Sequence, residues 1–490
     1  MTEQFPKPDG RTLFVGGEWR TASETYERFD PSDLGRSTGV FAAASEAEVD
    51  AAYGAAAGAQ AEWGATPAPQ RAEVLRVAAD LLEDRLEPAA RRLTADMGKA
   101  IRDARAEVGR SVAILRYFSG ELHQPWGETY PSADRSTTLF TVEQPLGVVC
   151  AITPWNFPFA IPTWKLAPAI GFGNAAVWKP AEVASGSAVL LTEALAAAGL
   201  PGGVLNLLTG KGRKMSGALV GDRRLAALTF TGSGAVGTRL RQAVADRNVK
   251  VQLELGGKNP AIVLADADLE DAAVQVVRGA MLSTGQRCTA TSRVYVERSV
   301  APRFRELLAE KAEALEVGDP FEEATDVGPL GSAEQLATVG GYLEIADREG
   351  AAVLTGELSP AALGPQAPGD CFVRPTVLSG VDPGSALLRE EIFGPVLVVE
   401  EIGGFEEGIA AANDTEFGLS STVFTSSISR ATEFIRRTES GVVHVNRETA
   451  GVEPHVPFGG VKGSSSMSRE QGKAARQFFT TSKTVYLRSV

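Results

Sequence analysis

The chain has 490 residues, more than a single hydrophobic core usually holds, so two or three domains are expected. Its composition is that of an ordinary globular protein, with 44% hydrophobic and 22% charged residues. The 48 basic and 61 acidic side chains give a net charge of -13, which argues against nucleic acid and anionic membranes as general partners.

The cysteines and the N-terminus indicate a cellular compartment. Cys150, Cys288 and Cys371 are too few and too scattered for a disulfide framework, which favours the reducing cytoplasm. With three histidines and no Cys-x-x-Cys sequence, a structural zinc site is not expected, and we predict no metal. Residues 1–10 are polar, and no apolar run is long enough to span a bilayer. We therefore expect no signal peptide and no membrane span.

Residues 11–41 are predicted to form short strands and turns, and the following part of the chain to residue 122 is predicted to be mainly helical. A possible capping box at residues 45–48 opens an Ala-rich helix that ends near Trp63. Apolar residues at helical spacing predict a longer helix over 70–96, which Pro88 is expected to interrupt. Another helix is expected over 99–122.

From residue 137 onward, strands and helices are predicted to alternate. Strands are expected at 137–142, 147–152, 176–179, 204–208 and 225–230, and helices near 184–199, 211–220 and 234–246. A second alternating region begins after Gly257, with a strand at 261–264, a helix at 267–282 and a strand at 292–297. Such alternation predicts parallel sheets with helices on both faces. Residues 356–370 are predicted to form a surface loop.

Two patterns at strand ends indicate a nucleotide. Gly232–Gly237 matches G-x-G-x-x-G between a strand that ends at Phe230 and a helix, where backbone N–H groups can hold a pyrophosphate. An ordinary tight turn is the alternative. Lys179 and Glu182 also follow a strand, and they could bond ribose hydroxyls or form a solvated surface pair.

Candidate catalytic groups lie in three segments. Cys288 and Glu254 are 34 positions apart, and each has glycines close by in the sequence. A thiolate can form a covalent intermediate, and a nearby carboxylate can activate the water that resolves it. The alternatives are a buried structural thiol and a surface carboxylate. Asn156, between Pro154 and Pro158, could stabilise an oxyanion or could satisfy turn carbonyls.

Together these residues resemble the aldehyde dehydrogenase superfamily, the NAD(P)-dependent, non-acylating kind, from about residue 12 to residue 487. The segments that carry the resemblance are Pro154–Pro158, Phe230–Ser233, Glu254–Gly257, Gly285–Cys288 and Glu391–Pro395. The resemblance implies an α/β fold with a Rossmann-like cofactor domain, an α/β catalytic domain and a β-arm that mediates a homodimer or homotetramer. The implied cofactor domain is 1–123 with 147–256, and the implied catalytic domain is 257–450. The arm and the C-terminal segment are 124–146 and 451–490.

The resemblance also implies a mechanism. Cys288 attacks the aldehyde carbon to form a thiohemiacetal, and the Asn156 amide and the Cys288 backbone N–H hold the oxyanion. Hydride passes to NAD or NADP and leaves a thioester, and Glu254 then activates water to release the acid. The presence of Glu254 argues against the CoA-acylating branch.

By the same resemblance, Lys179 and Glu182 contact the adenosine ribose, Glu391 the nicotinamide ribose and Phe393 the nicotinamide. The other residues expected at the cofactor are Ile152, Thr153, Pro154, Trp155, Gly212, Phe230, Thr231, Gly232, Ser233, Val236, Leu255 and Gly256. Glu182 favours NAD because a carboxylate repels a 2′-phosphate, yet its side chain can swing away and admit NADP.

Residues 462–472 depart from the common family pattern Lys-x-Ser-Gly-x-Gly-Arg-Glu. Ser465 and Ser468 stand where glycines are usual, with one extra residue between them. This tail resembles the α-ketoglutaric semialdehyde (2,5-dioxopentanoate) dehydrogenase branch, whose product is 2-oxoglutarate. Arg287 could then clamp the distal carboxylate of the substrate, or it could form a structural ion pair or face solvent.

The substrate remains open between several classes. Phe157, Trp164 and Phe458 are expected to line the substrate tunnel, and they would also suit an aromatic or aliphatic aldehyde. Another semialdehyde, or a broad range of aldehydes, is therefore the alternative to 2,5-dioxopentanoate. A catalytically inactive structural or binding protein is a remote alternative, because Cys288, Glu254 and Asn156 are all present.

Overall fold

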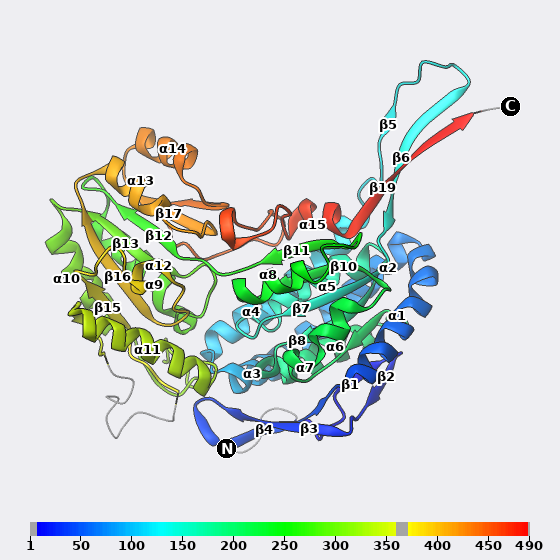
Figure 1. Cartoon of the computed structure of the whole chain (residues 1–490), viewed down its shortest axis with the longest axis horizontal. Helices are drawn as coiled ribbons and strands as arrows, with labels where there is room; N and C mark the ends of the chain where they lie inside the picture. Colours follow the sequence, from blue (N-terminus) through cyan, green and yellow to red (C-terminus); the bar gives the residue numbers. More distant parts are fainter. Residues whose placement is uncertain (1–6, 359–370, 489–490) are drawn as a thin grey trace.

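The computed structural model describes residues 7–358 and 371–488. Two lobes and an arm make up the molecule (Figure 1), and each lobe is built around a seven-stranded sheet. A three-stranded sheet forms the arm, which extends away from the lobe that holds the N-terminal helices (Figure 1). Most of residues 356–370, the predicted surface loop, lies outside the described residues.

The first sheet has the strand order β11-β10-β7-β8-β9-β1-β2. Its strands are β1 (Leu13–Val15), β2 (Glu18–Arg20), β7 (Val148–Thr153), β8 (Ala175–Pro180), β9 (Leu205–Leu207), β10 (Leu225–Thr231) and β11 (Lys250–Glu254). The run from β11 to β9 is parallel, and Thr231 is paired with Glu254. The carboxyl ends of these strands therefore meet along one edge, where ligands bind in open α/β sheets.

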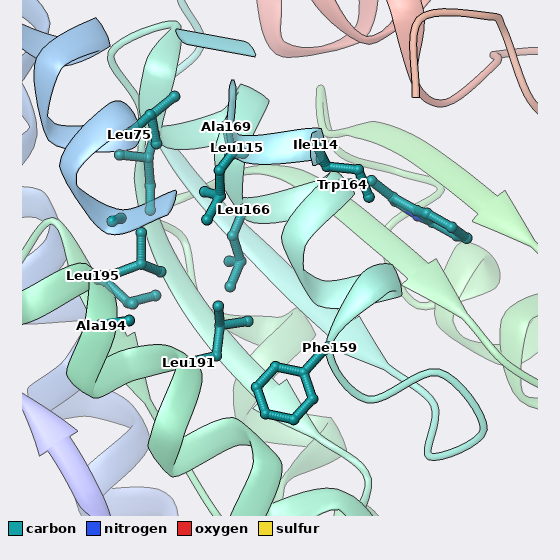
Figure 2. Packing of buried hydrophobic residues seen from close by; sticks show 14 of the residues in the cluster. Leu75, Ile114, Leu115, Phe159, Trp164, Leu166, Ala169, Leu191, Ala194 and Leu195 are labelled. Atoms are coloured by element: carbon teal, nitrogen blue, oxygen red, sulfur yellow. The ribbon is translucent and has the colours of Figure 1, made fainter. Parts of the chain in front are cut away.

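Helices cover both faces of this sheet because its strands alternate apolar side chains between the faces. On one face Val149 and Ala151 pack against α2 (Ala68–Asp84), α3 (Leu86–Met97), α4 (Ile101–Glu121), α5 (Ala160–Gly171) and α6 (Ser185–Ala197). Figure 2 shows part of this core. On the other face Val148 and Cys150 pack against α1 (Glu46–Ala65), α7 (Gly212–Gly221) and α8 (Gly234–Gln242).

The second sheet has the strand order β14-β15-β16-β13-β12-β17-β18. Its strands are β12 (Asn259–Val263), β13 (Thr291–Glu297), β14 (Ala352–Thr355), β15 (Thr376–Ser379), β16 (Val396–Ile402), β17 (Ser420–Phe424) and β18 (Val442–Val445). Its helices are α9 (Leu269–Met281), α10 (Ala301–Glu313), α11 (Ala333–Glu349), α12 (Ala386–Arg389), α13 (Phe405–Asn413) and α14 (Ile428–Arg437). The chain passes from the first sheet to the second between Glu254 and Asn259.

The arm pairs the C-terminal strand with a strand from the first third of the chain. In it, β19 (Thr480–Arg488) runs antiparallel to β6 (Thr137–Pro145) along its whole length, and β5 (Thr129–Tyr130) adds an edge. The short helix α15 (Gly472–Phe479) leads into β19. A separate hairpin of β3 (Glu24–Asp30) and β4 (Asp33–Ala43) lies near the N-terminus.

Most predicted elements are present within a few residues, and the capping box of Ser45 and Glu48 forms as expected. The break in the predicted helix over 70–96 is at Arg85, not at Pro88. Proline is tolerated in the first turn of a helix because its missing N–H would have no partner there, so Pro88 lies within α3. Helix α5 had no sequence prediction. All of its residues are buried, so it shows no amphipathic period. No helix within residues 7–358 and 371–488 is long and apolar enough to cross a membrane.

Candidate active site

Cys288 follows a strained turn between the two lobes. The turn η2 (Leu282–Gly285) contains Ser283 and Thr284 with φ of 53° and 56°, a conformation that costs free energy for residues other than glycine. Two hydrogen bonds hold it. The Ser283 hydroxyl donates to Asp103 at 3.1 Å, and the Thr284 hydroxyl donates to the Gly328 carbonyl at 3.0 Å. Neighbouring contacts therefore fix the backbone that presents Cys288.

The three cysteines have different surroundings. Cys150 and Cys371 are fully buried, whereas Cys288 keeps some exposed surface. Burial raises the pKa of the Cys288 thiol, and the charges of Glu391 and Glu254 raise it further. The backbone N–H groups of Thr289 and Cys288 act in the opposite direction, because they stabilise a thiolate. The description of an inert structural thiol therefore fits Cys150 and Cys371 better than Cys288.

Asn156 lies beyond β7 and is fixed beside the Cys288 turn. Its side-chain Nδ2 donates to the Gln286 carbonyl at 2.9 Å, two residues before the cysteine. Its own carbonyl accepts from Lys99 Nζ at 2.7 Å, and Lys99 is ion-paired with the buried Glu107. Glu107 also accepts two backbone N–H groups at the start of α5. The amide is thus held in place before any substrate arrives, as oxyanion stabilisation requires.

Glu254 ends β11 and is only 2% exposed. Its Oε2 accepts the Ser465 hydroxyl at 2.6 Å, while Oε1 has no hydrogen-bond partner among the described residues. Burial raises the pKa of Glu254 well above its usual value, and the charge of Glu470 raises it further. The Ser465 hydrogen bond and the charges of Lys165 and Arg469 lower it. A carboxyl group with a raised pKa is suited to general-base catalysis near neutral pH.

A cavity of about 1000 Å³ opens at the carboxyl ends of β7, β8 and β10. Twelve of the residues predicted to bind the cofactor line it, namely Ile152, Thr153, Pro154, Trp155, Lys179, Glu182, Gly212, Phe230, Thr231, Gly232, Ser233 and Val236. The Thr231 hydroxyl is buried without a hydrogen-bond partner among the residues that the structure describes, so it can bond a ligand. Burial lowers the pKa of Lys179 to about 8, and the charge of Glu182 opposes this. The size and position of the cavity fit a dinucleotide.

The four remaining cofactor candidates lie outside the lining of this cavity. Glu391 Oε1 accepts the Gly257 N–H at 3.1 Å, and burial raises the pKa of Glu391 to about 7. A side chain at Gly256 would collide with the Glu391 carboxylate. The Phe393 ring meets the Trp155 ring edge-on at 5.6 Å, which links this region to the cavity. Leu255 faces Gly237 of α8.

The candidate substrate residues are brought together only in part. The rings of Trp164 and Phe458 lie 5.8 Å apart, whereas the Phe157 ring lies beneath Lys99 Nζ at 3.6 Å. The Arg287 guanidinium lies 3.8 Å from the Asp103 carboxylate and 3.6 Å from that of Glu448. It also donates to the Ser283 hydroxyl at 3.3 Å. This geometry favours the ion-pair alternative for Arg287.

Proteins similar to this chain along nearly its whole length are aldehyde dehydrogenases. The aldehyde dehydrogenase family model matches residues 19–485. The chain is 41% identical over 477 residues to alpha-ketoglutaric semialdehyde dehydrogenase of Bacillus subtilis, which covers 97% of each protein. It is 39% identical over 477 residues to 2,5-dioxopentanoate dehydrogenase of Saccharolobus solfataricus, which covers 96% of this chain and 98% of that protein.

The chain belongs to the aldehyde dehydrogenase family. A solved structure of betaine aldehyde dehydrogenase from Staphylococcus aureus in complex with NAD+ matches it with a TM-score of 0.93 at 30% identity. The match covers 97% of this chain and 94% of that one. The resemblance and the fold predicted from the sequence are thereby confirmed, and the protein is an NAD(P)-dependent aldehyde oxidoreductase.

Several charged residues that line the cavity of this aldehyde dehydrogenase were not predicted from the sequence. Arg28, Lys211, Arg213 and Arg239 line the large cavity, and none forms an ion pair within the described residues. Lys211 and Arg213 lie together at the start of α7, whereas Arg28 belongs to β3 and Arg239 to α8, so no local motif joins all four. In residues 7–358 and 371–488, no group of three or more His, Cys, Asp or Glu side chains could hold a metal ion.

Proposed function

We propose that this aldehyde dehydrogenase oxidises 2,5-dioxopentanoate (α-ketoglutaric semialdehyde) to 2-oxoglutarate. The observation that carries the proposal is the similarity, over nearly the whole chain, to two relatives named for this substrate. The electrostatics of the described residues add support, because Arg110 and Arg287 are near enough for the charge of Arg287 to lower the pKa of Arg110. A substrate with a distal carboxylate requires a cation of this kind.

In the proposed mechanism, the Cys288 thiol loses its proton to solvent and its sulfur bonds the aldehyde carbon, and the Asn156 amide and the Cys288 backbone N–H donate to the resulting oxyanion. A nicotinamide dinucleotide bound in the large cavity would accept hydride from that carbon, which leaves a thioester. Glu254 takes a proton from water, and the water oxygen bonds the thioester carbon. The carbon–sulfur bond then breaks, and the acid leaves while Cys288 recovers its proton.

Arg110 is the cation that we assign to the distal carboxylate. Unlike Arg287, it forms no hydrogen bond or ion pair within the described residues. It precedes Ile114 by one turn of α4, and Ile114 lies beside Trp164 (Figure 2). Burial lowers the pKa of Arg110, the charges of Glu453 and Glu107 raise it, and that of Arg287 lowers it. A guanidinium without a partner can bind a carboxylate through two parallel hydrogen bonds.

The cofactor proposal is that both NAD and NADP are used. Glu182 favours a free ribose hydroxyl and hence NAD. The unpaired cations Arg28, Lys211 and Arg213 in the same cavity could receive a 2′-phosphate once Glu182 turns away. We expect Lys211→Ala and Arg213→Ala to weaken NADP binding more than NAD binding, as measured by calorimetric titration.

We propose a homodimer or homotetramer that assembles through the arm. Tyr130, Tyr486 and Leu487 expose large apolar side chains on β5 and β19, which would be covered in an interface. Light scattering of the intact protein and of a Tyr486→Asp variant tests this, with dissociation of the variant as the expected result. The cysteines form no disulfide among the described residues, which fits the reducing cytoplasm, the proposed compartment.

The experiment that tests the substrate measures reduced nicotinamide with 2,5-dioxopentanoate, succinic semialdehyde and benzaldehyde, each with NAD and with NADP. We expect kcat/KM for 2,5-dioxopentanoate to be well above that for the other two. Equal values, or a preference for benzaldehyde, would favour the alternative of a broad aldehyde dehydrogenase whose aromatic tunnel sets its selectivity.

A further inference from the structure

Ser465 lies in the short segment 464–466 at the edge of β11, and its own backbone is extended. The Leu255 N–H donates to the carbonyl of the first residue of this segment at 2.8 Å, and the N–H of its last residue donates to the Leu253 carbonyl at 2.9 Å. These bonds place Ser465 directly opposite Glu254 in an antiparallel bridge. The segment therefore behaves as a short extra strand whose middle residue faces the candidate base.

The Ser465 hydroxyl has a defined direction. Its Oγ accepts the Gly460 N–H at 2.6 Å and donates to Glu254 Oε2 at 2.6 Å. A hydroxyl has one hydrogen, and an N–H group already occupies its acceptor side, so that hydrogen points to the carboxylate. Short hydrogen bonds to an ionised carboxylate are about twice as strong as neutral ones.

The other oxygen of the carboxylate is left free. Glu254 Oε1 is buried and has no partner among the described residues. A methyl group at Gly459 would stand 2.9 Å from it, so only a glycine leaves room there. A buried acceptor without a protein donor is normally satisfied by water or by a ligand. One oxygen of Glu254 is thus anchored and the other is available.

We propose that Ser465 is a positioning residue for Glu254: its hydroxyl anchors Oε2 so that Oε1 takes the proton from the water that hydrolyses the thioester. The inference rests on the proposed function. The common family pattern has glycine at this position, so the hydroxyl of Ser465 is a departure from that pattern.

The pH dependence of turnover follows from this contact. Only the ionised carboxylate can accept the proton, and the Ser465 hydrogen bond lowers the pKa of Glu254, which burial and Glu470 raise. Loss of the hydroxyl therefore raises that pKa further. The acid limb of thioester hydrolysis should move to higher pH, while the acylation that precedes it is spared.

The test compares Ser465→Ala with Ser465→Thr, which keeps the hydroxyl. Ser466→Ala is the matched control, because it removes a hydroxyl that accepts the Leu253 N–H at 2.9 Å in the same segment without touching Glu254. Rapid-mixing kinetics would record the burst of reduced nicotinamide and the steady-state kcat across pH. We expect Ser465→Ala to keep its burst, to lose about tenfold in kcat at neutral pH and to move the acid limb up by about one pH unit.

Ser465→Thr should restore the parent pH profile, and Ser466→Ala should retain it. An unchanged acid limb in Ser465→Ala, or an equal shift in Ser466→Ala, would overturn the inference. If Ser465→Ala does not fold, Ser465→Gly serves in its place, since the backbone here is extended and suits either residue. An unmodified enzyme that reduces no nicotinamide with any aldehyde would instead refute the proposed function itself.

Discussion

Two buried carboxylates near the Cys288 turn, Glu107 and Glu254, differ in how their oxygens are satisfied. Glu107 is ion-paired with Lys99 through one oxygen and accepts two backbone N–H groups with the other. Glu254 has a single hydrogen bond, and no lysine or arginine of the described residues lies within ion-pairing distance. Both oxygens of Glu107 have partners, so we interpret its role as structural. One oxygen of Glu254 has none among the described residues, which leaves it available for proton transfer.

The largest effect is expected from Glu254→Gln, which keeps the shape of the side chain and removes its basicity. We expect kcat to fall about 10²–10⁴-fold, with the burst of reduced nicotinamide retained. The melting temperature should stay the same or rise, because an unpaired buried charge is removed. Stopped-flow kinetics and thermal melting measure the two quantities. Equal loss of the burst and of the steady state would contradict the role in hydrolysis.

Glu107→Gln should do the opposite. It leaves the Lys99 ammonium buried without a carboxylate, so the free energy of unfolding should fall by about 3–5 kcal/mol, as followed by chemical denaturation. The double variant Lys99→Met with Glu107→Leu removes both charges and should recover most of this loss. A single variant as stable as the parent would show that the pair is not structural.

Arg110 and Arg287 differ in the same way as the two carboxylates, because only Arg287 has ion-pair partners among the described residues. Arg110→Ala removes the unpaired guanidinium, and we expect KM for 2,5-dioxopentanoate to rise about 10–100-fold, with little change for benzaldehyde. Arg287→Ala should mainly lower stability, since it leaves Asp103 and Glu448 without their cation. If Arg287→Ala raised KM and Arg110→Ala did not, the assignment would be reversed.

The smallest effect concerns the thiol. Burial and nearby negative charge raise the pKa of Cys288, so its thiolate fraction, and its alkylation by iodoacetamide, should rise about tenfold per pH unit below that pKa. Glu391→Gln removes one of these charges and should speed alkylation severalfold at fixed pH. Mass spectrometry would localise the label, and Cys150 should remain unlabelled while the protein is folded.

Local sequence predicted much of the fold and the central chemistry. The strands that end at Thr153 and Glu254 could be placed because apolar runs stop at turn residues there. Parallel strands then bring their carboxyl ends together. Cys288 and Asn156 lie in segments that could be recognised from the sequence. The hydrogen bond from Asn156 to the Gln286 carbonyl, which brings the two segments together, is seen only in the folded chain.

Other features depend on contacts between distant segments and have no local pattern. Helix α5 is buried all round, so it lacks the period that reveals a surface helix. In the sequence, Arg110 is one of many arginines. Only the structure shows that it has no hydrogen-bond or ion-pair partner among the described residues. Ser465 was noticed only as a departure from a family pattern, and its contact with Glu254 spans 211 positions of the chain.

The position of Ser465 just upstream of the arm has a consequence for protein engineering. The C-terminal segment bonds Glu254 through Ser465, pairs Lys165 with Glu470 and then, at Thr480, enters the strand that runs along the arm. Ser465, which contacts the base, lies only 15 positions before Thr480, where that strand starts. Truncations and affinity tags beyond this strand therefore act on a segment that is bonded directly to the candidate base, and kinetic work should compare tagged with untagged protein.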